Sequence, residues 1–500
     1  MSETQTFFQK LKARIAEETS EKKEEIDREL PFVVMLFALL STSGVSLYDS
    51  WKRLRKMNLL PRFQEEAEEL VRQVEVLGKD PLTAMYELGE KTGSKAYRDF
   101  LGGFVSTIKS GGKISDYMQS KLRVIFELRN KEMTRSTEKI ATLVESYSVM
   151  LILILCIYIL YSLLTSSTSM EQITGMNISS SPLMTFIIAF VAVPTISLLF
   201  LLVANNMHKS TMLNLTSVYK KTIISMAAAT GVMVAFVFVP GLSEIGTSIG
   251  LSLLLTVFLV IGVLPGIVEY YKLARINYNA EASLPSFLRD ITESQKTGIS
   301  PEKSIIHATK RRDYGLFSQF LHLIRSQIEW GVSLKEIFRN IKQKISSWPV
   351  LVNFMMMVET IEVGGGSVRS LEILSEYSEK ELESQINKRA LLKPYVILAF
   401  VWSVLIALTT NIITVTMFVL NQFASASGTQ ILSAAMAEDS GILSLGIIFQ
   451  CWLSGLFMGK ISEGNIAAGL KYSAILTITA YISLIVSQDL LADLFGVVTF

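Results

Sequence analysis

The sequence predicts an all-α polytopic membrane protein: two homologous cytoplasmic helical-bundle domains of about six helices each, plus about seven transmembrane helices. Half of the 500 residues are hydrophobic and only 18% are charged, with a mean hydropathy of +0.40. The apolar residues gather in long windows, and the segments between them repeat a set of landmarks. No segment shows the strict alternation of apolar and polar residues that is typical of strands.

Long apolar windows predict the membrane spans. A spanning helix needs about 20 predominantly apolar residues. Seven windows qualify: residues 143–164, 183–204, 223–241, 249–271, 396–420, 441–459 and 472–491. Asp489 interrupts the far end of the last window. The apolar run 30–40 is too short to span a membrane, so we expect it to form a buried core helix.

The positive charges predict the orientation of these spans. All 47 Lys and Arg residues lie in four stretches: 24 in 1–139, 3 in 209–221, 18 in 272–393 and 2 in 460–471. Because short cytoplasmic loops retain Lys and Arg, we expect all four stretches on the cytoplasmic side of the cell membrane. An odd number of spans then puts the N-terminus inside and the C-terminus outside.

Spans and charges together predict four segments along the chain. The first cytoplasmic helical domain is expected at 1–140 and is followed by four spans in 141–271. The second cytoplasmic domain is expected at 272–394 and is followed by three spans in 395–500.

The two cytoplasmic segments share an internal repeat. Its landmarks recur with one offset of 254 residues. They pair Leu30 and Pro31 with Leu284 and Pro285, Gly44 with Gly298, and Gly111 and Gly112 with Gly365 and Gly366. We expect these landmarks to mark structural turns, with the glycines at the ends of helices.

Helix-start signals recur with the landmarks. Ser46 with Asp49 and Ser333 with Glu336 resemble capping boxes. Pro394, which follows the charged last helix of the second domain, predicts a break or a kink before the next span.

The sequence contains no pattern for covalent or metal chemistry. The nearest approach to a nucleotide-binding loop, Gly455 to Lys460, is one residue short and continues with Ile461 where a hydroxyl should bind magnesium. Three scattered histidines give no metal-ligand spacing. We therefore expect no enzymatic activity and no cofactor. The net charge of +2 offers no basic surplus for nucleic acid.

A transporter or channel with duplicated cytoplasmic domains is the main alternative, and a seven-span receptor is another. Carboxylates within spans are candidates for ion coupling, but Glu145, Glu269 and Asp489 all lie near span ends, where carboxylates commonly reach water. Asn177 begins a glycosylation pattern on a segment expected outside the cell.

Two basic clusters occupy related positions in the two cytoplasmic domains. The first contains Lys52, Arg53, Arg55 and Lys56, and the second contains Lys310, Arg311 and Arg312. Each cluster fits either a solvated face that contacts lipid headgroups or a docking patch for a cytoplasmic partner.

The landmarks together resemble the type II secretion F superfamily, the inner-membrane platform proteins of type II secretion, type IV pili and the archaellum. The matching motifs are Leu30-Pro31, residues 43–46 and 110–112, and in the second copy Leu284-Pro285, residues 297–300 and 364–366. Four spans between the domains, and the glycine-rich stretch 455–470, are similar to the branch that serves archaella and archaeal pili.

The resemblance implies a non-enzymatic assembly platform. Such a platform binds a hexameric secretion ATPase on its cytoplasmic side, passes ATP-driven movement to prepilin or archaellin subunits in the lipid bilayer, and works as a homodimer. The basic residues Lys310, Arg311, Arg312, Lys52 and Arg53 are the tentative ATPase-docking residues.

Overall fold

The computed structural model describes residues 2–166, 186–207, 212, 214–239, 250–311, 313–364, 367–425 and 433–495. Within these ranges 16 α-helices account for nearly all of the ordered backbone, together with one π-helix and one 3-10 helix, and there is no strand. The expected all-α class is confirmed.

The first part of the chain forms α1 (Ser2–Thr42), α2 (Leu47–Leu54), α3 (Pro61–Glu75), α4 (Pro81–Lys91), α5 (Lys95–Lys109) and α6 (Ile114–Ser166). The π-helix Ile188–Ala192 leads into α9 (Val193–Met207), which α10 (Thr216–Phe238) follows. The second part forms α12 (Leu251–Lys296), α13 (Pro301–Arg311), the 3-10 helix Gly315–Phe317, α14 (Ser318–Glu329), α15 (Leu334–Lys342), α16 (Trp348–Gly364) and α17 (Val368–Ser425). The last helices are α18 (Ser433–Glu463) and α19 (Ile466–Phe495).

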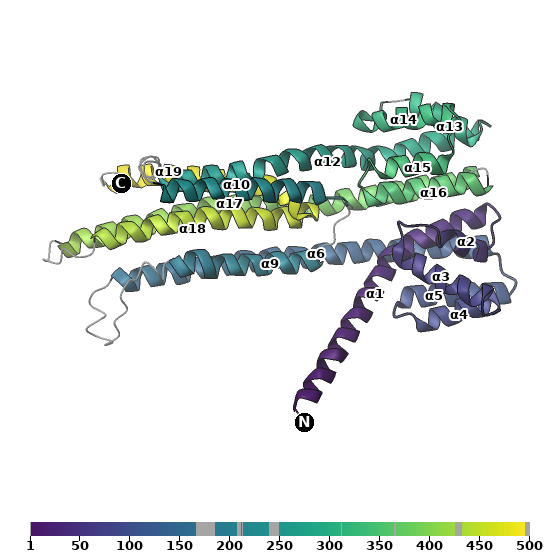
Figure 1. The fold of residues 1–500 in the computed structure, drawn as a ribbon, viewed down its shortest axis with the longest axis horizontal. Coiled ribbons are helices and arrows are strands. Elements are labelled where there is room, and N and C mark those ends of the chain that lie inside the picture. Colours follow the sequence, from purple (N-terminus) through teal and green to yellow (C-terminus); the bar gives the residue numbers. More distant parts are fainter. Residues whose placement is uncertain are drawn as a thin grey trace. The chain divides into compact units, whose positions relative to one another are not determined.

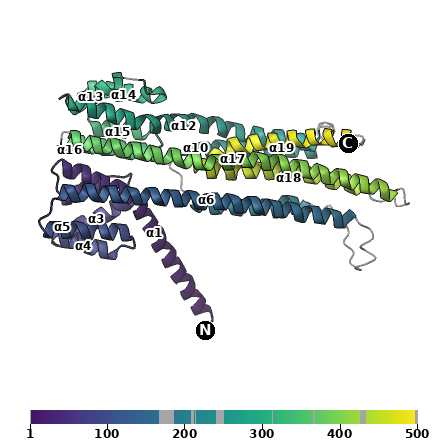
Figure 2. The same ribbon diagram turned by 180° about the vertical axis from the view of Figure 1, so that it is seen from behind.

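The chain divides into two compact units. Unit 1 contains residues 1–134 and 275–386, and unit 2 contains residues 135–274 and 387–500. Both repeat copies therefore belong to unit 1, where α1 to α5 form one group of helices and α13 to α16 the other (Figures 1 and 2).

The repeat predicted from the landmarks is present in the helices. α2 and α13 begin 254 residues apart, at Leu47 and Pro301, and so do α6 and α17, at Ile114 and Val368. Ser46 caps α2 by accepting a hydrogen bond from the backbone N–H of Asp49, and Ser333 caps α15 in the same way through Glu336. Each copy thus contributes six helices to unit 1, counting the ends of the long ones.

The glycine landmarks that the structure describes lie at helix ends. Gly44 and Gly298 adopt φ of +79° and +86° directly after α1 and α12, and Gly111 adopts +71° after α5. This left-handed conformation is readily accessible only to glycine. Gly112 follows in the same turn, whereas Gly365 and Gly366 lie outside the described residues.

One sequence expectation about proline is wrong, and of the break or kink expected at Pro394 the break is absent. Leu30 and Pro31 lie inside α1, and Leu284 and Pro285 lie inside α12, so these pairs do not form turns. Leu30 and Leu284 are buried because they face the core, which explains their place in the motif. Pro394 does not break α17, which runs unbroken from Val368 to Ser425. A proline removes one backbone hydrogen bond, and the long apolar helix continues past it.

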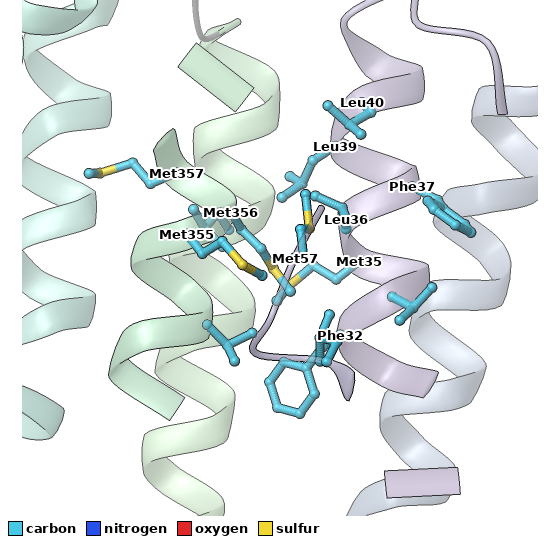
Figure 3. Packing of buried hydrophobic residues seen from close by; sticks show 14 of the residues in the cluster. Phe32, Met35, Leu36, Phe37, Leu39, Leu40, Met57, Met355, Met356 and Met357 are labelled. Atoms are coloured by element: carbon cyan, nitrogen blue, oxygen red, sulfur yellow. The ribbon is translucent and has the colours of Figure 1, made fainter. Parts of the chain in front are cut away.

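The core of unit 1 is built around α1 and α16. Every residue from Phe32 to Leu40 of α1 is at most 1% exposed, and every residue from Val350 to Val358 of α16 is at most 5% exposed. A helix that is apolar all round must be enclosed on all sides. In Figure 3, Met355 and Met356 point toward α1 and Met57, while Met357 points the other way.

These two central helices come from different copies and are not equivalent in the repeat. The counterpart of α16 is α5, which buries one face only. The two copies therefore share one core, and neither copy contains all of it.

Unit 2 contains the apolar parts of the long helices. Six described helices are long and apolar enough to cross a membrane: Ile114–Cys156, Ile188–Met207, Leu251–Lys296, Val368–Ile413, Gly441–Glu463 and Ile466–Leu490. The predicted window that is left over, residues 223–241, overlaps α10, a helix of 23 residues that is not among the six. The protein is therefore a polytopic membrane protein, while the count of seven spans stays a prediction.

Candidate docking surfaces and helix contacts

Polar and aromatic contacts join the two copies inside unit 1. The Arg129 guanidinium lies 2.9 Å from the Glu381 carboxylate, and it also lies over the ring of Phe32, 4.5 Å from the ring centre. Trp348 packs edge-on against Phe32 and donates a hydrogen bond of 2.9 Å to the carbonyl of Leu59. These contacts fix the register of the first copy against the second.

Glu29 anchors α3 to α1 within the first copy. Its carboxylate accepts a hydrogen bond of 3.1 Å from the backbone N–H of Phe63, in the first turn of α3. The side chain is almost fully buried, and this burial raises the pKa of Glu29 to about 7. The sequence offered no sign of this contact, because Glu29 stands in a segment of many charged residues.

The first basic cluster is largely engaged in ion pairs within unit 1. Arg53 contacts Glu359 of α16 at 3.3 Å. Lys52 contacts Glu75 at 3.0 Å, and Arg55 approaches the same carboxylate at 3.9 Å. Lys56 is exposed. The predicted docking residues Lys52 and Arg53 therefore stabilise the packing of α2.

The second basic cluster has a similar structural role. Arg311 lies 2.7 Å from Glu293 and 3.3 Å from Asp290, whose carboxylate is buried and also accepts a hydrogen bond from the Tyr314 hydroxyl. Lys310 is exposed, and Arg312 lies outside the described residues. The two clusters do not come together in one patch that the structure describes.

The first copy has a polar hollow of about 460 Å³ between α4, α5 and α6. Gly102 and Gly103 form part of its wall because they lack side chains, and its charged residues are Glu90, Arg98, Asp99 and Lys121. Because the two acidic and two basic side chains balance, the hollow favours neither an anionic nor a cationic ligand. In the second copy the two glycines are replaced by Met356 and Met357, which belong to the core.

The outer face of α15 carries a row of basic residues. Lys335, Arg339 and Lys342 follow one another at helical spacing and are exposed, whereas Leu334, Ile337 and Ile341 are buried. Sequence analysis missed this stripe, although the spacing of four and three residues between the cations could have indicated it.

In unit 2, α18 and α19 form a tight antiparallel hairpin. A side-chain carbon added to Gly459 would lie 2.0 Å from the Cα of Gly469, and one added to Gly455 would lie 2.2 Å from the Cα of Ser473. Small residues allow helix backbones to approach this closely in membranes. Lys460, buried at the end of α18, donates a hydrogen bond of 2.9 Å to the carbonyl of Gly464 in the connecting turn.

A buried polar cluster connects α6, α9 and α18. The Tyr147 hydroxyl lies 2.7 Å from the Ser454 hydroxyl and 3.2 Å from that of Ser197. The Gln450 amide donates hydrogen bonds to Tyr147 at 3.1 Å and to Ser197 at 2.6 Å. These four uncharged residues come from three distant parts of the sequence and form no pattern there, so the sequence alone does not predict the cluster.

The carboxylates considered for ion coupling lie elsewhere. Glu145 accepts a hydrogen bond of 3.1 Å from the Tyr395 hydroxyl, Glu269 pairs with Lys221 at 2.7 Å, and Asp489 is exposed on α19. Among the described residues, no three His, Cys, Asp or Glu side chains gather closely enough to hold a metal ion. Asn177 lies outside the described ranges.

Comparison with known protein families decides the family. The family model described as type II secretion system (T2SS), protein F, matches twice, at residues 34–162 and 287–414, which together make up more than half of the chain. The chain belongs to the type II secretion system protein F family.

The two protein F matches follow the structural repeat. The first runs from the buried part of α1 through most of α6, and the second runs from the end of α12 through most of α17, so each covers one repeat copy and most of the apolar helix that follows it. α9, α10, α18 and α19 lie outside both matches.

The chain is also similar to a protein of another organism over most of its length. The chain is 22% identical over 484 residues to an uncharacterized protein of Methanocaldococcus jannaschii, MJ1286, in an alignment that covers 92% of this chain and 80% of the relative. No solved structure matches. The protein F domain is thus present in two copies within a polytopic membrane protein.

Proposed function

We propose that this protein is a non-enzymatic platform in the cell membrane for assembly of a filament like a type IV pilus or an archaellum. A hexameric secretion ATPase would act on unit 1 from the cytoplasm, and prepilin or archaellin subunits would meet unit 2 in the bilayer. The observation that carries the proposal is the duplicated protein F domain, each copy continuing into an apolar helix.

The shared core of unit 1 supports this role. Because α1 and α16 come from different copies, a force applied to one copy acts on a single packed body. A platform that receives movement from an ATPase needs such a body. The ion pairs of Arg53 with Glu359 and of Arg129 with Glu381 add further links between the copies.

Gene deletion tests the proposal directly. Cells without the gene should lack a surface filament in electron micrographs, and a plasmid copy should restore it. The purified protein should also retain the secretion ATPase encoded in the same genome. Normal filaments on the deletion strain would rule out the platform role.

The proposed orientation has its own test. A thiol reagent that cannot cross the membrane should label Phe500→Cys in intact cells and should label Lys113→Cys only after the cells are opened. The opposite pattern would reverse the proposed topology.

Transport is the second candidate function, and the polar cluster around Tyr147 and Gln450 is the observation in its favour. Buried polar groups between membrane helices can line a path for ions or substrates. Proteoliposomes that contain the purified protein should show no ion flux above empty vesicles if the platform role is correct. Flux that disappears in Gln450→Leu would favour transport.

A further inference from the structure

Two long helices carry the same pair of cations just before their apolar parts. Arg135 and Lys139 lie in α6, ahead of the apolar window 143–164, and Arg389 and Lys393 lie in α17, ahead of the window 396–420. The two pairs are related by the same offset of 254 residues as the other landmarks. Between residues 131–140 and 385–394 the two copies share no other residue at equivalent positions. The repeat therefore retains an Arg and a Lys, four residues apart, at the start of each apolar segment.

The packing of unit 2 does not account for these cations. All four are exposed, and residues four apart lie on one face of a helix. The residues beside the lysines, Ile140 and Leu392, are instead fully buried in one cluster between the helices. Within the described ranges, no carboxylate lies within 4 Å of the charged groups of Arg135, Lys139 or Lys393. These three side chains thus present unneutralised charge to their surroundings.

The pairs lie at the depth of lipid head groups. Tyr395 stands two residues after Lys393, and its hydroxyl donates a hydrogen bond of 3.1 Å to Glu145 of α6. Tyrosine is enriched at the boundary between membrane and water. Beyond this contact neither apolar window contains another charged residue. At about 1.5 Å of rise per residue, the four cations lie within roughly 5–12 Å of the apolar windows.

We propose that each Arg–Lys pair binds the phosphate group of an anionic phospholipid in the leaflet where these spans begin. A guanidinium group can donate two parallel hydrogen bonds to phosphate oxygens, and a lysine on the same helix face adds a compact positive charge. The acyl chains of the bound lipid would lie along the apolar window that follows each pair. This inference rests on the membrane spans and not on the proposed platform function.

Charge and position together favour an anionic lipid as the occupant. Lys and Arg next to a span attract anionic head groups, and the attraction falls off within about 10 Å of the surface. The two sites should differ in affinity. Glu138 is exposed directly before Lys139 in α6, whereas α17 has no acidic residue between Glu383 and its apolar window and carries Lys388 in addition. The α17 site should therefore bind more tightly.

Native mass spectrometry of the purified full chain in a non-ionic detergent tests the proposal. The protein is titrated with phosphatidylglycerol, and in parallel with phosphatidylcholine of the same acyl chains. Two phosphatidylglycerol molecules should bind above the phosphatidylcholine level. The double variant Arg389→Gln, Lys393→Gln should weaken the tighter site about 30-fold, because each cation near an anionic surface contributes about fivefold. The double variant Arg135→Gln, Lys139→Gln should remove only the weaker site.

Two controls separate the site from net charge and from folding. Lys303→Gln with Lys310→Gln removes two exposed cations of α13, which is not followed by a span, and should leave lipid binding unchanged. The exchange Arg389→Lys with Lys393→Arg keeps both charges and should retain most of the binding. All variants should melt at the wild-type temperature in phosphatidylcholine nanodiscs, because the substituted side chains are exposed.

Three results would overturn the proposal. Equal binding of phosphatidylglycerol and phosphatidylcholine would show that the sites select no charge. Wild-type affinity in both double variants would place the bound lipids elsewhere on the protein. If millimolar inorganic phosphate displaced phosphatidylglycerol while chloride at equal ionic strength did not, the pairs would be sites for a free anion. None of these results bears on the platform role, which gene deletion tests separately.

Discussion

The close approach of α18 and α19 allows a stability prediction in which one methyl group is added. Gly459→Ala would place a side-chain carbon 2.0 Å from the Cα and 2.1 Å from the backbone nitrogen of Gly469. Carbon atoms in contact prefer a separation of about 3.5–4.0 Å, so the two helices would have to separate by about 1.5 Å. Both atoms that oppose the new carbon belong to the backbone and cannot rotate away.

The cost follows from this displacement. Overpacking a tightly packed site destabilises a protein by about 1–3 kcal/mol or more. For a folded unit of this size, each kcal/mol corresponds to about 2–4 °C in melting temperature. We therefore expect Gly459→Ala to lower the melting temperature of unit 2 by about 5–10 °C.

Cys451 provides the assay. This thiol is 2% exposed on α18, whereas Cys156 is exposed. In a Cys156→Ser background, a thiol-reactive fluorophore should therefore report the temperature at which unit 2 opens. The fluorescence midpoint of the purified full chain in detergent gives the melting temperature.

A matched glycine supplies the control. Gly231 in α10 has no atom within 4 Å of an added side-chain carbon. Gly231→Ala should leave the midpoint unchanged or raise it slightly, because alanine is favoured over glycine in a helix by about 1 kcal/mol. Equal midpoints for Gly459→Ala and Gly231→Ala would show that the backbones of α18 and α19 do not approach as described.

Three further predictions concern single polar groups. Arg129→Ala should destabilise unit 1 by about 3–5 kcal/mol in chemical denaturation, because it leaves the buried Glu381 carboxylate without its ion pair. Glu29 has a pKa of about 7 in the folded protein against an ordinary value of 4.5, so its own contribution to the stability of unit 1 should be greatest below pH 4.5 and should be lost as the pH rises to about 7; the loss is at most about 3 kcal/mol, and Glu29→Gln should remove this part of the pH dependence of the melting temperature. Tyr147→Phe should lower the melting temperature of unit 2 by an amount equivalent to about 1–3 kcal/mol, because Ser197 and Ser454 lose a buried partner; an unchanged melting temperature would show that the cluster contributes nothing to stability.

The sequence predicted the features that depend on residues close to one another along the chain. The all-α class, the repeat and the buried run in α1 all follow from periodicity and from helix punctuation. The helix ends at Gly44 and Gly298 could be predicted, because the left-handed backbone conformation there excludes most other residues. The break considered at Pro394 is absent, because a proline within a long apolar helix need not end it.

Contacts between distant residues could not be predicted in this way. The sequence shows that α16 is apolar, but not that it packs against α1, more than 300 residues earlier in the chain. For the same reason, Arg53 and Arg311 looked like free basic patches, and only their partners Glu359 and Asp290 reveal a structural role. The basic stripe of α15, by contrast, was visible in the sequence as a helical spacing of cations.

The shared core of unit 1 has a consequence for how the protein is made. α1 leaves the ribosome early, while α16, which covers its apolar surface, follows after four predicted spans have been synthesised. At about 5–20 residues per second, the run 30–40 would wait roughly 15–60 s for this partner. During that interval a chaperone, the translocation machinery or the membrane surface must shield it, so nascent chains that end before α16 should be prone to aggregate.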